Sequence, residues 1–525
     1  MTGSPVAGLA PSLKLILRRD RILLPVWFYI FVAMPISSIV SAKGLYGTHE
    51  LLRSAADSAN GNPSLVAMFG PIYAPEPGAV AMVKMTVMMG ACLALLTGLL
   101  VIRHTRADEE SGRRELLGAA AISRIAAPVG AMIEATALSV AIGVVTAIGT
   151  AALGAPVGGA VTFGTVWALT GIVFAAAALV CAQLAEGARA ARGLFAAVLA
   201  VAYLLRALGD LQGGNVNPAA WSWVSPLGWA QQMRPYAGDR WWPAALLVVG
   251  AVVLAAIGLW IAERRDLGAG VIAVGGGRAT AAASLRSAPA LAWRLHRSAI
   301  GMWTVAFLAV GIAFGGMASA VEGLLDSQNA ADMVRRLGGG AADIVDSFFG
   351  AEFSIMGMVA AVLAISLAIG PAAEERAGRA EYLLAAPVRR TTWFAAQLVI
   401  ALAGSASVML AAGIGASLVA SRELVPAALG VLPAVWILTA VGALAGALSS
   451  RWTAVAWVAL TLCVLVLVGD VLRLPAAVNR LSPFTHVVTQ PGTSIATTGA
   501  VVLVLLAGAG LVGSVAVVSR RDLAS

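Results

Sequence analysis

The sequence has few of the residues on which soluble enzymes and cofactor sites depend. Charged residues make up only 12% of its 525 residues. Lysine occurs at three positions, and none lies between a glycine and a serine or threonine as in a phosphate-binding loop: Lys14, Lys43 and Lys84. No polar segment is long enough to form a soluble ATPase domain. We therefore expect no ATP hydrolysis and no enzyme active site in this chain.

Cysteine and histidine are equally scarce and are not arranged as metal ligands. The three cysteines all lie in apolar stretches: Cys92, Cys181 and Cys463. The four histidines are scattered near the ends of such stretches: His49, His104, His296 and His486. Neither set has the close spacing typical of zinc sites. The sequence therefore predicts no disulfide, no metal site and no cofactor bound to this chain.

Apolar residues dominate the chain, at 60% of the sequence with a mean hydropathy of +0.89. They form runs of about 20 residues or more, long enough to cross about 30 Å of hydrocarbon as helices. Only a helix satisfies every backbone N–H and C=O within one such segment, and the short alternating segments of a barrel are missing. The net charge of +9 is concentrated at the ends of these runs, which indicates membrane topology rather than nucleic-acid binding. We predict an all-α polytopic membrane protein.

Single residues and short motifs recur in the same order in both halves of the sequence, which suggests that the chain contains the same six-span unit twice. Trp27 matches Trp303, Gly112 matches Gly378, and the Arg-Arg-Asp-Leu sequence at 264–267 recurs at 520–523. Predicted spans in the first half are 23–41, 79–102, 123–153, 158–185, 194–209 and 243–262. Those in the second half are 299–320, 353–371, 391–419, 426–448, 452–471 and 495–518. An even number of spans per half makes this a parallel repeat.

The predicted domains follow from this repeat. The first six-span half covers 1–267, a Gly/Ala/Ser-rich cytoplasmic linker covers 268–288, and the second half covers 289–525. Basic and apolar residues mix at 11–22 and 290–298, which suits an interfacial helix before each half. The N-terminus shows no cleavable signal, and most basic residues lie in segments on one side. We expect a multi-pass protein of the plasma membrane with both termini in the cytoplasm.

Two dense charged segments, which we call the islands, interrupt the apolar runs between the second and third spans of each half. The first island is 109–124 and the second is 375–390. Both read E-x-x-G-R-x-E-x-L and end in an [IV]-x-R sequence, in register without a gap. A loop whose charges merely fix orientation does not require such matched spacing. We predict that each island forms a short cytoplasmic coupling helix that a soluble partner grips, with the solvated loop as the alternative.

Halves with an interfacial helix and a charged island resemble the ABC-2 type permease family, over essentially the whole chain. Within it, the chain is most similar to the fused two-half permeases of actinobacterial drug and polyketide-antibiotic exporters. The islands correspond to that family's E-x-x-G-[TR]-x-E-x-L pattern. The positions so matched are Glu109, Gly112, Arg113, Glu115 and Leu117, and Glu375, Gly378, Arg379, Glu381 and Leu383. Commoner members supply one half per chain and dimerise, whereas here one chain should suffice.

The resemblance implies that two copies of a separate ATPase subunit, carrying ATP and Mg, dock beneath the halves. The chain itself would be the permease subunit of an exporter of hydrophobic or amphiphilic compounds. In each island, the carboxylates and guanidinium groups can pair across such an interface, with leucine or tyrosine side chains as apolar anchors. The two glycines would permit a turn or a close approach.

The substrate pathway is less clearly marked. Met82, Met85 and Met89 fall on one face of the second span, where thioether side chains make an adaptable lining for bulky apolar molecules. Packing against neighbouring helices is the alternative. Glu134 lies within the third span, where it either pairs with a basic group at the inner end of the second span or binds a cationic substrate.

Arg206 and Asp210 are spaced i and i+4, so we expect them to pair as a structural plug at the outer end of the fifth span.

Two other functions compete with the ATP-driven exporter. An ion-gradient-driven secondary multidrug transporter would need carboxylates or histidines deep in several spans, and Glu134 is the convincing candidate. A membrane scaffold or lipid-handling protein would not need the duplicated islands.

Overall fold

The computed structural model of the chain is built from helices throughout the part that it describes. That part comprises residues 7–113, 123–213, 217–266, 268–272, 285–325, 341–467, 475–487 and 497–521, together with residues 280, 282 and 491. Among these residues, 11 helices are long and apolar enough to cross a membrane. The prediction of an all-helical polytopic membrane protein is confirmed at this level.

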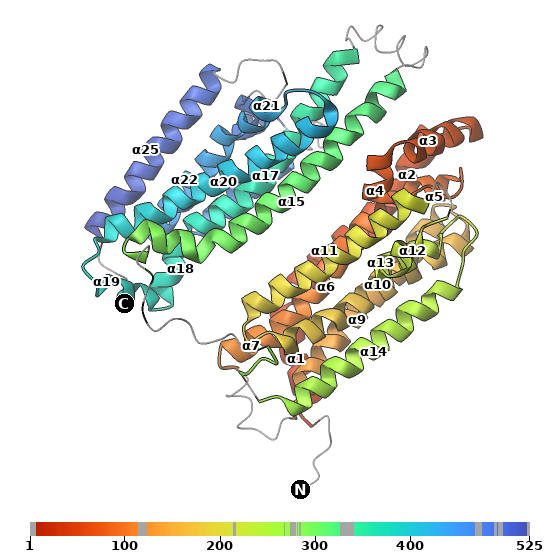
Figure 1. The fold of residues 1–525 in the computed structure, drawn as a ribbon, viewed down its shortest axis with the longest axis horizontal. Coiled ribbons are helices and arrows are strands. Elements are labelled where there is room, and N and C mark those ends of the chain that lie inside the picture. Colours follow the sequence, from red (N-terminus) through yellow and green to blue (C-terminus); the bar gives the residue numbers. More distant parts are fainter. Residues whose placement is uncertain are drawn as a thin grey trace. The chain divides into compact units, whose positions relative to one another are not determined.

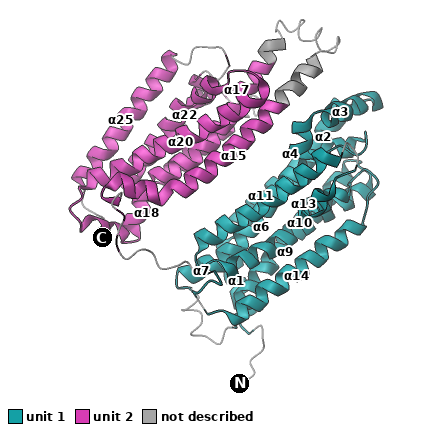
Figure 2. Cartoon of the chain, in the orientation of Figure 1, with its two compact units in different colours: residues 1–277 teal, residues 278–525 magenta. Residues whose placement is uncertain are grey.

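The chain divides into two compact units, Met1–Gly277 and Arg278–Ser525 (Figure 2). The division falls inside segment 268–288, which we predict as the linker. Large apolar side chains cover the outer surfaces of terminal helices in both units, for example Val249 and Val252 in unit 1 and Leu505 and Val512 in unit 2. Such surfaces suit contact with lipid chains rather than water.

The described residues of unit 1 contain six candidate spans, and their arrangement is drawn in Figure 1. Its elements are α1 (Leu9–Arg19), α2 (Leu23–Leu45), α3 (His49–Gly61), α4 (Pro63–Phe69), α5 (Pro77–Lys84), η1 (Met85–Met89), α6 (Gly90–His104), α7 (Arg106–Glu110), α9 (Ala126–Ala152), α10 (Val157–Leu184), α11 (Ala188–Gly213), α12 (Ala220–Trp223), α13 (Pro226–Gln232) and α14 (Trp242–Arg264). Helix α10 is the most buried span, and α6, α9, α11 and α14 pack around it.

Unit 2 contains five candidate spans in its described residues. Its elements are α15 (Ala288–Leu325), α17 (Ala341–Ala368), α18 (Gly370–Arg376), α19 (Arg379–Leu384), α20 (Arg390–Ala420), α21 (Val425–Leu429), α22 (Leu432–Leu448), α23 (Ala454–Leu467), α24 (Ala476–Asn479), η3 (Pro483–His486) and α25 (Thr498–Arg520). The predicted span 452–471 corresponds to α23, which is shorter, and residues 468–471 lie outside the described part. The twelve-span repeat therefore stays a prediction.

Only the first of the two predicted interfacial helices is a separate helix in the structure. Helix α1 is separate from α2, because the chain leaves helical geometry at Asp20, whose buried carboxylate lies 2.8 Å from Arg103 and 2.7 Å from His104. In unit 2 the separate helix predicted at 290–298 is wrong, since α15 runs without a break from Ala288 to Leu325. There His296 instead lies 2.9 Å from the Gln397 side chain, without an interruption of the helix.

The fifth span also differs from its predicted bounds of 194–209. Helix α11 runs from Ala188 to Gly213, so it extends beyond these bounds at both ends. The Glu110 carboxylate accepts a hydrogen bond from the Ala188 backbone N–H at 2.9 Å. A carboxylate at this position satisfies one of the free N–H groups of the first turn and complements the helix dipole, which explains the earlier start.

Small residues allow the closest helix crossings, as is common between membrane helices. A Cβ atom added at Gly311 on α15 would lie 2.2 Å from the carbonyl oxygen of Ala412 on α20. In unit 1, a Cβ at Gly143 on α9 would lie 2.3 Å from the carbonyl oxygen of Gly164 on α10. The glycines therefore set how closely these backbones approach.

We predict opposite effects for two substitutions on α15. Gly311→Ala should lower the free energy of unfolding by about 1–3 kcal/mol, because its methyl group meets a backbone carbonyl that cannot move aside. Gly301→Ala should be neutral or stabilising by up to about 1 kcal/mol, since no atom lies within 4 Å of that position and alanine favours helix. Thermal unfolding in detergent measures both, and equal midpoints would contradict the packing account.

Candidate functional site

The two islands share one backbone turn, described here in each unit separately. After α7 the chain turns at Gly112, with φ 71°, and after α18 it turns at Gly378, with φ 70°. The N–H of Gly112 donates to the carbonyl of Glu109 at 3.0 Å, and that of Gly378 to the carbonyl of Glu375 at 2.9 Å. Only glycine adopts such a positive φ without strain. Of the two uses expected for these glycines, a turn or a close approach, the structure has a turn at both.

An ion pair spans each turn and presents an arginine at the surface. Arg113 lies 3.1 Å from Asp108, with 58% of its side chain exposed. Arg379 lies 2.6 Å from Glu374, with 61% exposed. Because the carboxylate partner fixes one edge of each guanidinium, the arginine is oriented while its remaining N–H groups stay free to bind another molecule.

The first glutamate of each island points into its own unit instead of outward. In unit 1 the Glu109 carboxylate lies 2.7 Å from Arg265, at the end of α14, and its side chain is only 2% exposed. In unit 2 the Glu375 carboxylate pairs with Arg521, at the end of α25. Both arginines belong to the recurring Arg-Arg-Asp-Leu sequence. The structure thus joins two recurring motifs that lie far apart in the chain.

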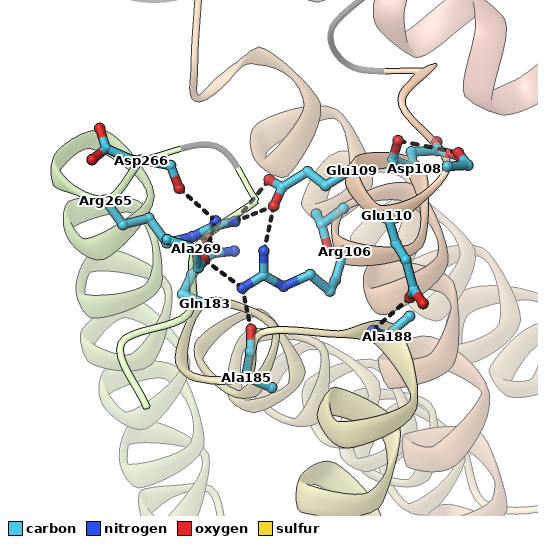
Figure 3. A network of polar contacts seen from close by, with 12 residues as sticks. Arg106, Asp108, Glu109, Glu110, Gln183, Ala185, Ala188, Arg265, Asp266 and Ala269 are labelled. Atoms are coloured by element: carbon cyan, nitrogen blue, oxygen red, sulfur yellow. Dashed lines mark hydrogen bonds and ion pairs between the residues drawn. The ribbon is translucent and has the colours of Figure 1, made fainter. Parts of the chain in front are cut away.

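Arg106 completes the network of unit 1 (Figure 3). Its buried guanidinium lies 2.7 Å from Glu109 and donates to the backbone carbonyls of Ala185 and Ala269. Arg265 also donates to the Gln183 side chain at 2.7 Å. The network therefore fixes α7 to the end of α10 and to the segment after α14.

The corresponding contacts of unit 2 are fewer and more exposed. Arg376 donates to the carbonyl of Ser450 at 2.8 Å, and Arg521 donates to that of Leu448 at 3.3 Å. Arg390, at the start of α20, donates to the carbonyl of Arg521 at 3.0 Å. The second island is thus held to the ends of α22 and α25.

The other predicted island residues have varied surroundings. Glu381 on α19 is exposed, and the neighbouring Tyr382 exposes 84% of its surface. Leu383 is partly buried and packs against the core of unit 2. Glu115 and Leu117 lie outside the described residues. The docking role predicted for the island residues stays a prediction, and exposed side chains able to serve it include Arg113, Arg379, Glu381 and Tyr382.

A π-helix interrupts the second span at its methionines. Met85–Met89 forms the π-helix η1, whose wider turn changes the spacing expected for Met82, Met85 and Met89. The Trp167 indole N–H donates to the Met85 carbonyl at 3.0 Å. Met82 is buried in the core of unit 1, and Met85 and Met89 are partly buried against it. Sequence periodicity could not show this π-helix.

Glu134 on α9 is buried next to a basic group at the end of α6. Its Oε2 atom lies 3.4 Å from Nε2 of His104. This is the location expected for a partner at the inner end of the second span. Asp20 also reaches the same imidazole, so three titratable side chains gather here. Their spacing along the sequence does not identify the group.

A second polar network lies at the other end of unit 1. The predicted pair of Arg206 and Asp210 is confirmed, at 3.2 Å with both side chains buried. Arg206 also donates to the Ala67 carbonyl at 2.6 Å, and Gln231 donates to Asp210 at 2.9 Å. Burial and the nearby Asp210 carboxylate raise the pKa of Tyr73 to about 12, so its phenol stays neutral. The network holds α4 and α13 against α11.

Comparison with known proteins gives two matches. The family model described as "Multidrug efflux system permease Rv1217c, C-terminal domain" matches residues 9–261 and 285–518. The multidrug efflux system permease protein Rv1217c of Mycobacterium tuberculosis (strain ATCC 25618 / H37Rv) is 38% identical over 499 residues, which cover 92% of this chain and 90% of that protein.

We predict that the same substitution affects the two inward glutamates unequally. Glu109→Gln should lower the free energy of unfolding by about 3–5 kcal/mol, because it leaves two buried arginines facing each other without their shared carboxylate. Glu375→Gln should cost less, since its side chain and that of Arg521 are 10% and 22% exposed. Thermal unfolding of both variants is the measurement. An equal loss, or a larger loss for Glu375→Gln, would contradict this description of the two networks.

Proposed function

The chain belongs to the family of multidrug efflux system permeases, and we propose that it is the membrane subunit of an ATP-driven ABC-2 type exporter. It moves hydrophobic or amphiphilic compounds, such as drugs or antibiotics, out of the cell. Both six-span halves are supplied by one chain. A separate ATPase binds in two copies, one to each island, and carries the ATP and Mg.

The observation that carries this proposal is the construction of the islands. Each has the same glycine turn, the same ion pair across it and an inward glutamate bound to the arginine of its unit's last helix. These contacts hold a short charged segment rigidly at the end of several spans. A force applied to the island by a soluble partner would therefore be transmitted to those spans.

The distribution of basic side chains supports a cytoplasmic position for the islands. Arginines gather at the end of each unit where the island lies: Arg18, Arg19, Arg103, Arg106, Arg113 and Arg265 in unit 1, and Arg376, Arg379, Arg389, Arg390, Arg520 and Arg521 in unit 2. Cytoplasmic segments of membrane proteins carry such an excess of basic residues. An intracellular ATPase would therefore meet the islands.

An ion-gradient-driven secondary transporter is the alternative, and the Glu134 and His104 pair is the feature that it would use. Another buried ion pair of unit 1, between Arg206 and Asp210, is engaged in holding α4 and α13. A single buried carboxylate beside one histidine offers a poor relay across the membrane. The ATP-driven mechanism needs no such relay in this chain.

We predict that exposed island residues, rather than the inward glutamates, determine partner binding. Charge exchange by Arg379→Glu together with Glu381→Arg should reduce the amount of ATPase subunit that co-purifies with the tagged chain from its native membrane by about half. It removes charge-assisted contacts at the second island, whereas the copy on the first island remains bound.

The matched control is the exchange Glu50→Arg together with Arg53→Glu. Both residues are exposed on α3, at the end of unit 1 opposite α7 (Figure 1). This control should leave ATPase recovery unchanged, and thermal unfolding should show that both double variants are folded. If no ATPase accompanies the wild-type chain, or if the two exchanges act alike, the docking role of the islands is wrong.

A further inference from the structure

Three buried titratable side chains from separate segments converge beside the first island. Asp20 follows α1, His104 ends α6 and Glu134 lies on α9, and all three side chains are at most 1% exposed. Nε2 of His104 lies 2.7 Å from Asp20 and 3.4 Å from Glu134. One ligand atom from each residue falls within 4.8 Å of the other two. The cluster takes no part in the function proposed for the islands.

The Glu134 carboxylate has no hydrogen-bond donor that would explain its burial. Neither of its oxygen atoms makes a hydrogen bond, although the side chain is only 1% exposed. Asp20 is better satisfied, since Arg103 lies 2.8 Å from its Oδ1 atom. Burying a carboxylate without a hydrogen bond or a cation is costly. The position therefore needs a cation or a proton that the surrounding protein groups do not provide.

A carboxylate also lies on the far side of the imidazole, beyond hydrogen-bond distance. Nδ1 of His104 faces Asp108 at 4.0 Å, and Arg19 holds that carboxylate at 2.6 Å. A carboxylate behind a ligating histidine accepts its remaining N–H and directs the other nitrogen toward the metal. Asp108 belongs to α7 and also pairs with Arg113 of the island.

We propose that Asp20, His104 and Glu134 bind one divalent first-row transition-metal ion, such as zinc. A neutral imidazole and two carboxylates carry a total charge of −2, which such an ion neutralises. The ligand types suit zinc and its neighbours, whose bonds to nitrogen and carboxylate oxygen measure about 2.0–2.2 Å. The three ligand atoms need only small side-chain movements to reach a common centre. On binding, the ion takes the place of the proton between His104 and Asp20, and Nδ1–H then faces Asp108.

The corresponding positions of the second half provide a comparison within the same chain. With Trp27 aligned to Trp303 and Gly112 to Gly378, the three ligands correspond to His296, Gly370 and Ile400. His296 there contacts the uncharged Gln397 at 2.9 Å. Helices can thus pack at this place without two buried carboxylates. The acidic pair is a feature of unit 1, and His296, a histidine outside such a cluster, serves as a control for His104.

The test is metal binding by the full-length chain, purified without a polyhistidine tag and freed of metal with a chelator. Titration with Co²⁺, followed by its visible absorption, should give one site per chain, and Zn²⁺ should displace the Co²⁺. His104→Gln and Glu134→Gln should each weaken binding by at least about 100-fold, because each removes a direct ligand. His296→Gln should bind like the wild type.

A second measurement keeps the test valid if His104→Gln folds poorly. Glu134→Gln conserves volume, and its thermal unfolding can be compared with and without Co²⁺. The midpoint of the wild type and of His296→Gln should rise when the ion is added, and that of Glu134→Gln should not. Absence of binding to the wild type, or undiminished binding to Glu134→Gln, would overturn the metal site without bearing on the proposed exporter.

Discussion

In each unit, the arrangement of the end that carries the island depends on one ion pair. This pair joins the inward glutamate of the island to the arginine after the unit's last helix. In unit 1, Glu109 is shared by Arg106 and Arg265, all with nearly buried side chains. A buried carboxylate between two arginines tolerates little displacement, since separation would leave charges without partners in a medium of low polarity. The positions of α7, α10 and α14 are therefore coupled at this point.

This coupling explains how a short segment could transmit movement. The inward glutamate anchors the island, while the glycine turn directs the next arginine outward, where 58% of Arg113 and 61% of Arg379 are exposed. Anchoring and recognition are thus assigned to different residues of one motif. A partner that pulls on the exposed side would act on the ends of the spans, and both islands could respond because they share the glycine turn and the ion pair across it.

Much of this design is visible in the sequence, and the rest depends on long-range contacts. Length and hydropathy predict the helices, the recurrence of Gly112 and Gly378 predicts the turn, and i,i+4 spacing predicts the pair of Arg206 with Asp210. The partner of Glu109 could not be predicted, because Arg265 lies on another helix.

Three further features have no signal in local sequence. The π-helix at Met85–Met89 depends on the Trp167 indole, which donates to a carbonyl there. The cluster of Asp20, His104 and Glu134 comes from three segments, so spacing alone argued against a metal site. The unbroken α15 reflects the lack at His296 of the buried carboxylate that ends α1 at Asp20.

The most direct test of the central claim, that the islands couple this permease to ATP hydrolysis, is the energy source of transport. Inside-out vesicles from the native membrane would be given a fluorescent amphiphilic drug, with uptake compared between vesicles that contain and lack this chain. The account predicts uptake that requires ATP, fails with a non-hydrolysable analogue and persists when an ionophore collapses the proton gradient. Uptake driven by a proton gradient without ATP would contradict it and would direct attention to Glu134.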